Sequence, residues 1–154
     1  MNNFEALFAE YSCVPTDESV KAAVADILTK HVEENNNVEV WKQCLHSIDL
    51  TTLNGDDTTE KVETMAQRVN EFEDHFPGVP NVAAMCVYPA LVQTAADTLT
   101  EPIGIAAVAA GFPASQTFIE VKVAEAAMAV AAGATEIDIV ISIGKFLEGN
   151  YQEV

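Results

Sequence analysis

The chain has 154 residues, enough for one domain with a hydrophobic core and too few for a second catalytic domain. Its 7 Lys and Arg against 24 Asp and Glu give a formal net charge of −17. That charge argues against nucleic acid or an anionic membrane as a partner, because both bind basic surfaces.

The N-terminus has no basic start followed by an apolar run, so it does not resemble a signal peptide, and no stretch suits a membrane span. We therefore expect a cytosolic protein. Cysteines and histidines are scattered without the close spacing of metal ligands, and the odd number of cysteines argues against a disulfide framework. These residues are Cys13, Cys44, Cys86, His31, His46 and His75.

Residues 1–40 are predicted to form a helical extension of two amphipathic helices. A helix start signal, Pro15-Thr16-Asp17-Glu18, precedes the second helix, and the polar residues 33–37 end it. The apolar residues that recur at helical spacing are Phe4, Leu7 and Phe8 in the first helix and Val20, Val24, Ile27 and Leu28 in the second.

Residues 41–154 are predicted to form a separate domain, in which strands alternate with amphipathic helices. The predicted strands are residues 44–50, 82–87, 103–108 and 134–141. The first helix has N-cap candidates in residues 56–60, and the third has Ser115 as its predicted cap and Gly133 just after its end. Units of this kind build a parallel sheet.

Two architectures have such a sheet, the doubly wound fold and the TIM barrel. A doubly wound nucleotide-binding fold normally carries a glycine fingerprint after its first strand, and this chain has none. A TIM barrel has eight βα units and places its chemistry at the carboxyl ends of the strands. Here there are four units, and Asp49, Cys86 and Asp138 lie near three of those ends.

Asp138 lies within a run of isoleucine and valine that predicts a strand buried on both faces. A carboxylate in such a place is costly unless it is paired or hydrogen-bonded. Asp138 is therefore predicted either to anchor a polar network or to take part in proton chemistry. The pattern alone leaves both interpretations open.

Four segments at the predicted strand ends together resemble the deoxyribose-phosphate aldolase family of class I aldolases. They are Asp49-Leu50-Thr51-Thr52-Leu53-Asn54, Cys86-Val87-Tyr88-Pro89, the run from Ala107-Val108 to Gly111-Phe112-Pro113, and Glu136-Ile137-Asp138-Ile139-Val140. The resemblance covers about residues 41–154. It implies a TIM barrel that cleaves 2-deoxy-D-ribose 5-phosphate to D-glyceraldehyde 3-phosphate and acetaldehyde through a lysine Schiff base, without metal or cofactor.

The resemblance also implies roles for individual residues. Asp138 matches the acid that joins a proton relay with a second lysine and a water. Asp49, Thr51 and Asn54 match the pocket wall, and Cys86 matches a pocket cysteine that the mechanism does not require.

The family's Schiff-base lysine lies on strand six, its relay lysine on strand seven, and its phosphate-binding loops follow strands seven and eight. We expect this chain to end before strand five and to be inactive alone. A substitute Schiff-base lysine would need a lowered pKa. Lys61 and Lys122 are predicted on amphipathic helices beside acids, and Lys42 precedes the first strand. Lys145 is the single candidate for a substitute Schiff-base lysine. The alternative is that Lys145 is an ordinary solvated residue of the last helix.

Half a barrel would expose two strand edges and its interior face. We expect that face to carry apolar side chains, drawn from Ile48 or Leu50, Met85, Ile105 and Ile139. The chain is therefore predicted to form a two-fold dimer through this face or through its first or fourth strand, or by exchange of the N-terminal helices about residues 33–37.

Three functions are compatible with these patterns. The first is the N-terminal half of a deoxyribose-phosphate aldolase. The second is a non-catalytic, self-assembling half-barrel in which Asp49 and Asp138 are buried polar anchors. The third is another sugar-phosphate TIM barrel, which would not be expected to share all four segments.

Overall fold

The structure is a computed structural model that describes residues 3–11 and 15–154. The chain divides into two compact units, Met1–Trp41 and Lys42–Val154. None of the helices in the described ranges is long and apolar enough to cross a membrane.

The first unit is helical. It contains α1 (Asn3–Glu10), α2 (Asp17–Asn35) and the start of α3 (Val38–His46). Thr16 caps α2, because its hydroxyl accepts a hydrogen bond from the Ser19 backbone N–H at 3.2 Å. Both predicted helices are confirmed, but the apolar residues predicted for one face of α2 are exposed.

The predicted strand at residues 44–50 is largely wrong. Residues 38–46 form α3, and strand β1 is limited to Asp49–Thr51. Val38, Trp41 and Leu45 recur at helical spacing, and the Asn37 side chain accepts the backbone N–H of Val40 at 3.1 Å, which starts the helix. The helical period therefore extends further along the chain than the sequence pattern suggested.

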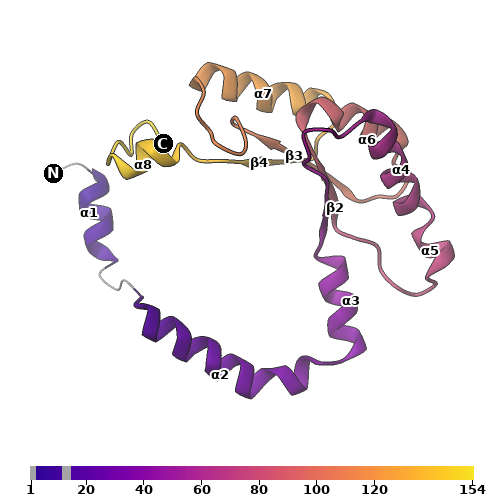
Figure 1. The fold of residues 1–154 in the computed structure, drawn as a ribbon, viewed down its shortest axis with the longest axis horizontal. Coiled ribbons are helices and arrows are strands. Elements are labelled where there is room, and N and C mark those ends of the chain that lie inside the picture. The colour runs from indigo at the N-terminus through magenta and orange to yellow at the C-terminus, as the bar shows by residue number, and fades with distance from the viewer. Residues whose placement is uncertain (1–2, 12–14) are drawn as a thin grey trace. The chain divides into compact units, whose positions relative to one another are not determined.

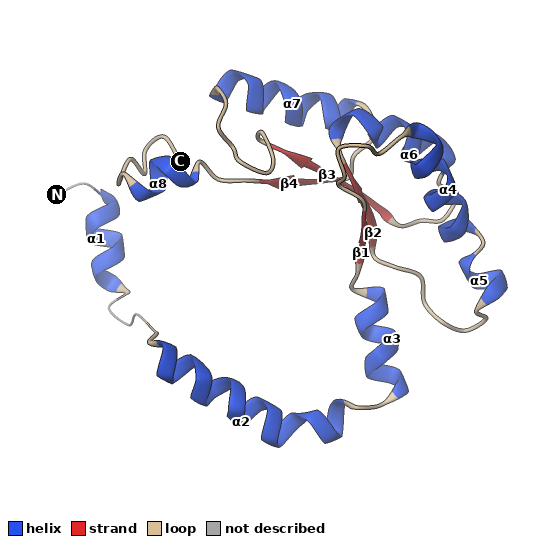
Figure 2. Cartoon of the chain, viewed as in Figure 1, coloured by secondary structure: helices blue, strands red, loops and turns tan. Residues whose placement is uncertain are grey.

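The second unit is built on a parallel sheet with the strand order β1-β2-β3-β4 (Figures 1 and 2). The other strands are β2 (Ala84–Val87), β3 (Gly104–Ala109) and β4 (Glu136–Ile139). The connecting helices are α4 (Thr59–Asn70), α5 (Phe72–His75), the 3₁₀-helix η1 (Pro89–Leu91), α6 (Val92–Thr98), α7 (Ile119–Ala131) and α8 (Ile143–Leu147).

Helices α4, α6 and α7 lie on one side of this sheet (Figure 2). Their buried residues form the main hydrophobic core with alternate residues of the strands, and β4 adds the half-buried Ile137. The buried core residues on these elements are Val62, Ala66, Val69, Met85, Val87, Val92, Ala95, Ile105, Ala107 and Ala129. Sequential parallel strands with helices on one face are the arrangement of a (β/α)8 barrel, whereas a doubly wound sheet is covered on both faces. The predicted half-barrel is confirmed.

The residues expected on the barrel-interior face lie on the opposite face of the sheet, one position away along each strand. Met85 and Ile105 belong to the core under the helices, and Leu50 packs against it. Side chains alternate between the two faces of a strand, so a shift of one residue assigns every side chain to the wrong face. The open face instead carries Asp49, Thr51, Cys86 and other residues of the same parity. The apolar residues on the open face are instead Cys86, Ala106 and Val108.

Strand β4 was predicted to be buried on both faces, and this is also wrong. Glu136, Asp138 and Ile139 are exposed, and Ile137 is half-buried. The cause is the position of β4 at the edge of the sheet, where it pairs with β3 alone. The carboxylate of Asp138 is thus not surrounded by apolar side chains in this chain.

The cap predicted for α7 is not Ser115. Helix α7 begins at Ile119, with Phe118 at the N-cap position and no side-chain cap bond. Ser115 is buried in the preceding loop, where its backbone N–H donates to the carbonyl of Gly111 at 2.8 Å. The caps predicted for α4 fare better, since the Thr58 hydroxyl accepts the Lys61 backbone N–H at 3.2 Å.

Candidate active site

Four of the predicted site residues lie on the sheet face opposite the helices. Thr51 pairs in register with Cys86, and Asp138 pairs with Val108 of the intervening strand. Cys86 and Val108 belong to one buried cluster on this face. Asp49 precedes Thr51 by two residues and so has the same orientation. The structure therefore brings Asp49, Thr51, Cys86 and Asp138 together along one face.

The other residues of this group shift the pKa of the Cys86 thiol. Burial raises the pKa of its thiol, and the negative charges of Asp138 and Asp49 raise it further, whereas a hydrogen bond with the Thr51 side chain lowers it. The net result is a pKa above the ordinary value for cysteine. The thiol is therefore neutral at neutral pH and a weak nucleophile.

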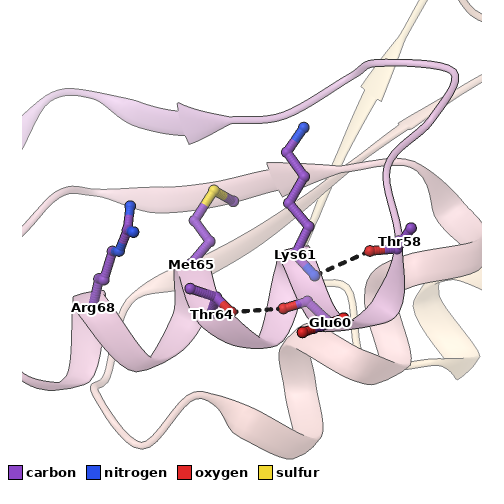
Figure 3. Close-up of a pocket in the computed structure, with 6 residues that line it drawn as sticks. All are labelled: Thr58, Glu60, Lys61, Thr64, Met65 and Arg68. Atoms are coloured by element: carbon purple, nitrogen blue, oxygen red, sulfur yellow. Dashed lines mark hydrogen bonds between the residues drawn. The ribbon is translucent and has the colours of Figure 1, made fainter.

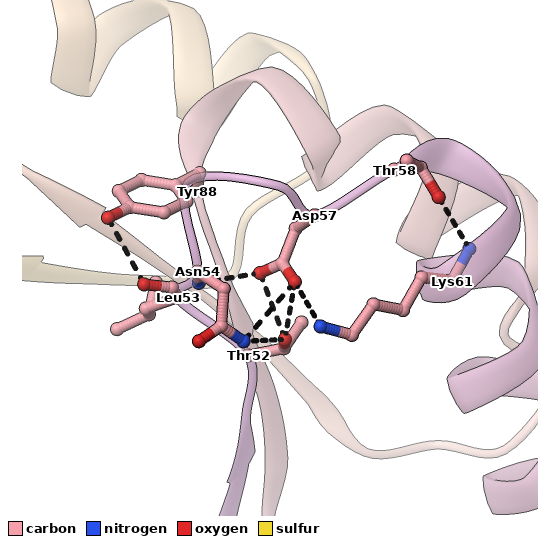
Figure 4. A network of polar contacts seen from close by, with 7 residues as sticks. All are labelled: Thr52, Leu53, Asn54, Asp57, Thr58, Lys61 and Tyr88. Atoms are coloured by element: carbon pink, nitrogen blue, oxygen red, sulfur yellow. Dashed lines mark hydrogen bonds and ion pairs between the residues drawn. The ribbon is translucent and has the colours of Figure 1, made fainter.

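Asn54, the fifth predicted site residue, lies in the loop after β1 and not on the sheet face. It is exposed, and its backbone N–H donates to Asp57 at 2.9 Å. Its side-chain amide donates to the Thr52 hydroxyl at 3.3 Å and to Asp57 at 3.4 Å. In this chain the hydrogen bonds of Asn54 thus stabilise the loop (Figure 4).

Asp57, which the sequence analysis treated only as a cap candidate, is the hub of that loop. Its carboxylate accepts hydrogen bonds from the Thr52 hydroxyl at 2.9 Å and pairs with the Lys61 ammonium (Figure 4). The Lys61 ammonium, with contributions from Asn54 and Thr52, lowers the pKa of Asp57 to about 2 even though burial acts in the opposite direction. The available signal was the spacing of Asp57 and Lys61, four residues apart at a helix start.

Leu53, Tyr88 and Phe112 cover part of the open face. They pack against the cluster of Cys86 and Val108, and the Tyr88 and Phe112 rings meet edge to face with centroids 6.2 Å apart. The Tyr88 hydroxyl also donates to the Leu53 carbonyl at 3.3 Å (Figure 4). These side chains were not selected as site residues, although Tyr88 and Phe112 each precede a proline shortly after a strand. These three side chains form an apolar surface next to the aspartates of the open face.

The lysines of the second unit have different surroundings. Lys145 is 41% exposed and lies 3.5 Å from Glu148 and 3.7 Å from Glu153, so it is not a desolvated amine. Lys61 pairs with Asp57. Lys122 was predicted to be a helix residue beside acids, but it is buried and its amine contacts two serine hydroxyls. The predicted helical position of Lys122 is confirmed, but its burial was not predicted, because α7 directs the side chain toward the adjacent loops.

Another concavity lies away from the open face. Its volume is about 420 Å³, and α4 and its cap supply its lining (Figure 3). The lining residues are Thr58, Glu60, Lys61, Thr64, Met65 and Arg68. Because Val62, Ala66 and Val69 of the same helix face the sheet, this concavity opens on the outside of the unit. Among the described residues, no cluster of three or more His, Cys, Asp or Glu side chains is arranged to hold a metal ion.

A sequential parallel sheet with helices on one face and carboxylates with a cysteine on the other defines part of a (β/α)8-barrel protein. The sequence profile of the DeoC/LacD family aldolases matches residues 44–153. The chain belongs to that family.

Proteins similar in sequence to this chain are named deoxyribose-phosphate aldolase. The human protein is 39% identical over 117 residues, which cover 68% of this chain and 36% of the human protein. The bovine protein is 38% identical over the same length and the same shares. The chain thus spans less than half the length of these relatives.

Solved structures give the same result for the fold. QR15, an aldolase, is 27% identical with a TM-score of 0.61, and the match covers 70% of this chain and 44% of that one. Deoxyribose phosphate aldolase from Aeropyrum pernix has a TM-score of 0.63 at 23% identity, over 90% of this chain and 52% of that one. The likeness to the Aeropyrum protein concerns the fold alone.

Proposed function

We propose that this chain forms the first half of the active-site face of a deoxyribose-phosphate aldolase. The observation that carries the proposal is the gathering of Asp49, Cys86 and Asp138 on one open face in a chain of this aldolase family. The substrate is 2-deoxy-D-ribose 5-phosphate, and the reaction takes place in the cytosol. The names of the human and bovine relatives favour this substrate over those of other sugar-phosphate barrels.

In the proposed reaction a lysine amine condenses with the substrate aldehyde and releases water. A base removes the proton of the C3 hydroxyl, the C2–C3 bond breaks, and its electron pair moves toward the iminium. D-glyceraldehyde 3-phosphate leaves, the enamine carbon takes up a proton, and water releases acetaldehyde and the free amine. Asp138 serves in the relay that moves these protons, an assignment that its exposure to the open face supports.

The neighbouring residues of the face prepare it for this chemistry. Asp49 and Thr51 form part of the pocket wall, and we assign Asn54 to the loop that borders it. Cys86 stays protonated because burial and the two carboxylates raise its pKa. A neutral thiol does not compete with the lysine for the aldehyde, since thiolate is the nucleophilic form.

Residues 1–154 alone are proposed to be inactive. Two of the lysines have surroundings that support this, because Lys61 and Lys145 are paired with carboxylates. Incubation with 2-deoxyribose 5-phosphate and borohydride, followed by intact mass measurement, tests the proposal, because borohydride reduces a Schiff base to a stable adduct. We expect no adduct. An adduct that disappears in Lys145→Ala would show the inactivity proposal to be wrong.

A second proposed function is assembly into a dimer, as a half-barrel module with or without catalysis. Apolar side chains along β4 and α7 favour it: Ile119, Val123, Ile139 and Ile141 are exposed and line one groove of about 230 Å³. Beside this groove, β4 presents an unpaired strand edge. The dimer is therefore proposed to form along the β4 edge.

A further inference from the structure

Lys122 is buried although it carries an ionisable amine. Its relative exposure is 9%, and lysine side chains are seldom buried unless partners replace the lost water. No ion pair within the described residues involves Lys122. Its Nζ instead donates to Ser115 Oγ at 2.7 Å and to Ser142 Oγ at 2.6 Å.

The two serines belong to different loops at the carboxyl ends of the strands. Ser115 lies in the loop between β3 and α7, and Ser142 lies between β4 and α8. Ser115 Oγ also donates to the carbonyl oxygen of Val140 at 2.9 Å. The loop after β3 is therefore bonded to the segment after β4 both directly and through the Lys122 amine.

The backbone of Ser115 supports a specific use of its hydroxyl. Its φ is 55°, in the left-handed region that glycine adopts without steric cost. A side chain at this position is strained, and the hydroxyl it carries contacts both Lys122 and Val140. Strained residues persist where surrounding interactions hold them, which here are the hydrogen bonds between the two loops.

We propose that Lys122 is a positioning residue, which fixes the carboxyl end of β4 through Ser115 and Ser142 and so sets the direction of the Asp138 side chain. Asp138 pairs with Val108 in the ladder between β3 and β4, and this ladder ends one residue later, at Ile139. Side-chain bonds hold the following segment, residues 140–142. The inference rests on the proposed function only for the role of Asp138.

The coupling between Asp138 and Cys86 provides a test that does not depend on stability. In a background with Cys13 and Cys44 replaced by serine, the loss of the S–H Raman band with rising pH reports the apparent pKa of Cys86. The change in that pKa on Asp138→Asn measures the coupling. We expect Lys122→Met to reduce the coupling by at least about half, because the end of β4 is no longer held.

Lys145→Met is the matched control. It removes one positive charge from α8, beside the same loops, but does not touch the two serines. It should leave the coupling unchanged. Equal coupling in folded Lys122→Met and in the unsubstituted background would overturn the proposal.

Two milder variants decide the matter if Lys122→Met does not fold. Ser142→Ala removes one acceptor of the amine, and Ser115→Gly relieves the backbone while removing both of its hydroxyl contacts. We expect reduced coupling in both, and unchanged coupling in both would overturn the proposal. The assay needs no aldolase activity, so the proposed reaction can fail while this result stands.

Discussion

Cys86 on β2 and Asp138 on β4 share one face of the sheet although β3 lies between them. Burial and the charge of Asp138 together raise the pKa of the Cys86 thiol, with a smaller contribution from Asp49. This relationship places the relay acid suggested by sequence beside a thiol that stays neutral. The pKa of Cys86 is also a property of this face that can be measured without the lysines of the proposed enzyme.

Replacement of Asp138 by asparagine should lower the pKa of Cys86, because it removes a negative charge that disfavours the thiolate. The S–H Raman titration measures the shift in the background without Cys13 and Cys44. Asp97→Asn is the control, since Asp97 is exposed on α6 and accepts a hydrogen bond from Gln93. An equal titration of Cys86 before and after the Asp138→Asn substitution would mean that the two residues do not share this face in solution.

The pair of Asp57 and Lys61 predicts a specific loss of stability in acid. Asp57 has a pKa of about 2 in the folded chain against 3.8 ordinarily. A lowered folded pKa gives stability that is complete above the unfolded pKa and is lost as pH falls through the folded one, here from about pH 4 to pH 2. Lys61→Met should flatten the fall in urea midpoint over this range.

Lys30→Met is the control for that series, because Lys30 pairs with Asp26 on the exposed surface of α2. Such surface pairs contribute little to stability. An acid response in Lys61→Met as steep as in the unsubstituted chain would show that the loop network does not depend on the ammonium.

Met85 and Ile139 test which strand residues form the core. Met85 is fully buried under the helices, and Ile139 is 63% exposed. Met85→Ala should lower the free energy of unfolding by about 2–5 kcal/mol. Ile139→Ala should cost less than about 1 kcal/mol. Urea unfolding measures both, and similar small losses would contradict the observed burial of Met85 and the exposure of Ile139 at the sheet edge.

Val123 and Val121 test the proposed dimer edge. Both are exposed valines of α7, but Val123 lines the groove beside β4, whereas Val121 lines a separate groove shared with η1 and α6. A lysine in a dimer interface loses its water without gaining a partner. Val123→Lys should therefore dissociate the dimer in sedimentation velocity experiments, and Val121→Lys should not. Equal sedimentation of both variants and the parent chain would argue against this edge.

The alternation of strands and helices was readable from the sequence because each repeat has its own apolar period. The start of α2 was readable as well, since Thr16 and its neighbours form a local capping pattern. Cys86 and Asp138 could be placed together because the carboxyl ends of parallel strands meet at one edge, whereas Asp49 begins β1 and shares their face only because side chains alternate along a strand.

Errors arose where the outcome depends on neighbours distant in sequence. The face on which Met85 lies depends on strand register, and the exposure of Asp138 depends on the edge position of β4. Ser115 and Lys122 are held by partners 25 and 20 residues away, Val140 and Ser142, so no local pattern revealed their burial. The hydrogen bonds of Asn54 are local. Whether Asn54 lies in the loop or on the sheet face, however, depends on the direction of the turn after β1.

The turnover of a full-length barrel tests the central claim most directly. In a chimera, this chain would be continued by the second half of the human deoxyribose-phosphate aldolase, and cleavage of 2-deoxyribose 5-phosphate would be measured. We expect an active enzyme in which Asp138→Asn lowers turnover by about 10²–10⁴, the usual contribution of a positioned acid-base group. Cys86→Ala should keep most of the activity. A folded but inactive chimera, or full turnover with asparagine at position 138, would contradict the account.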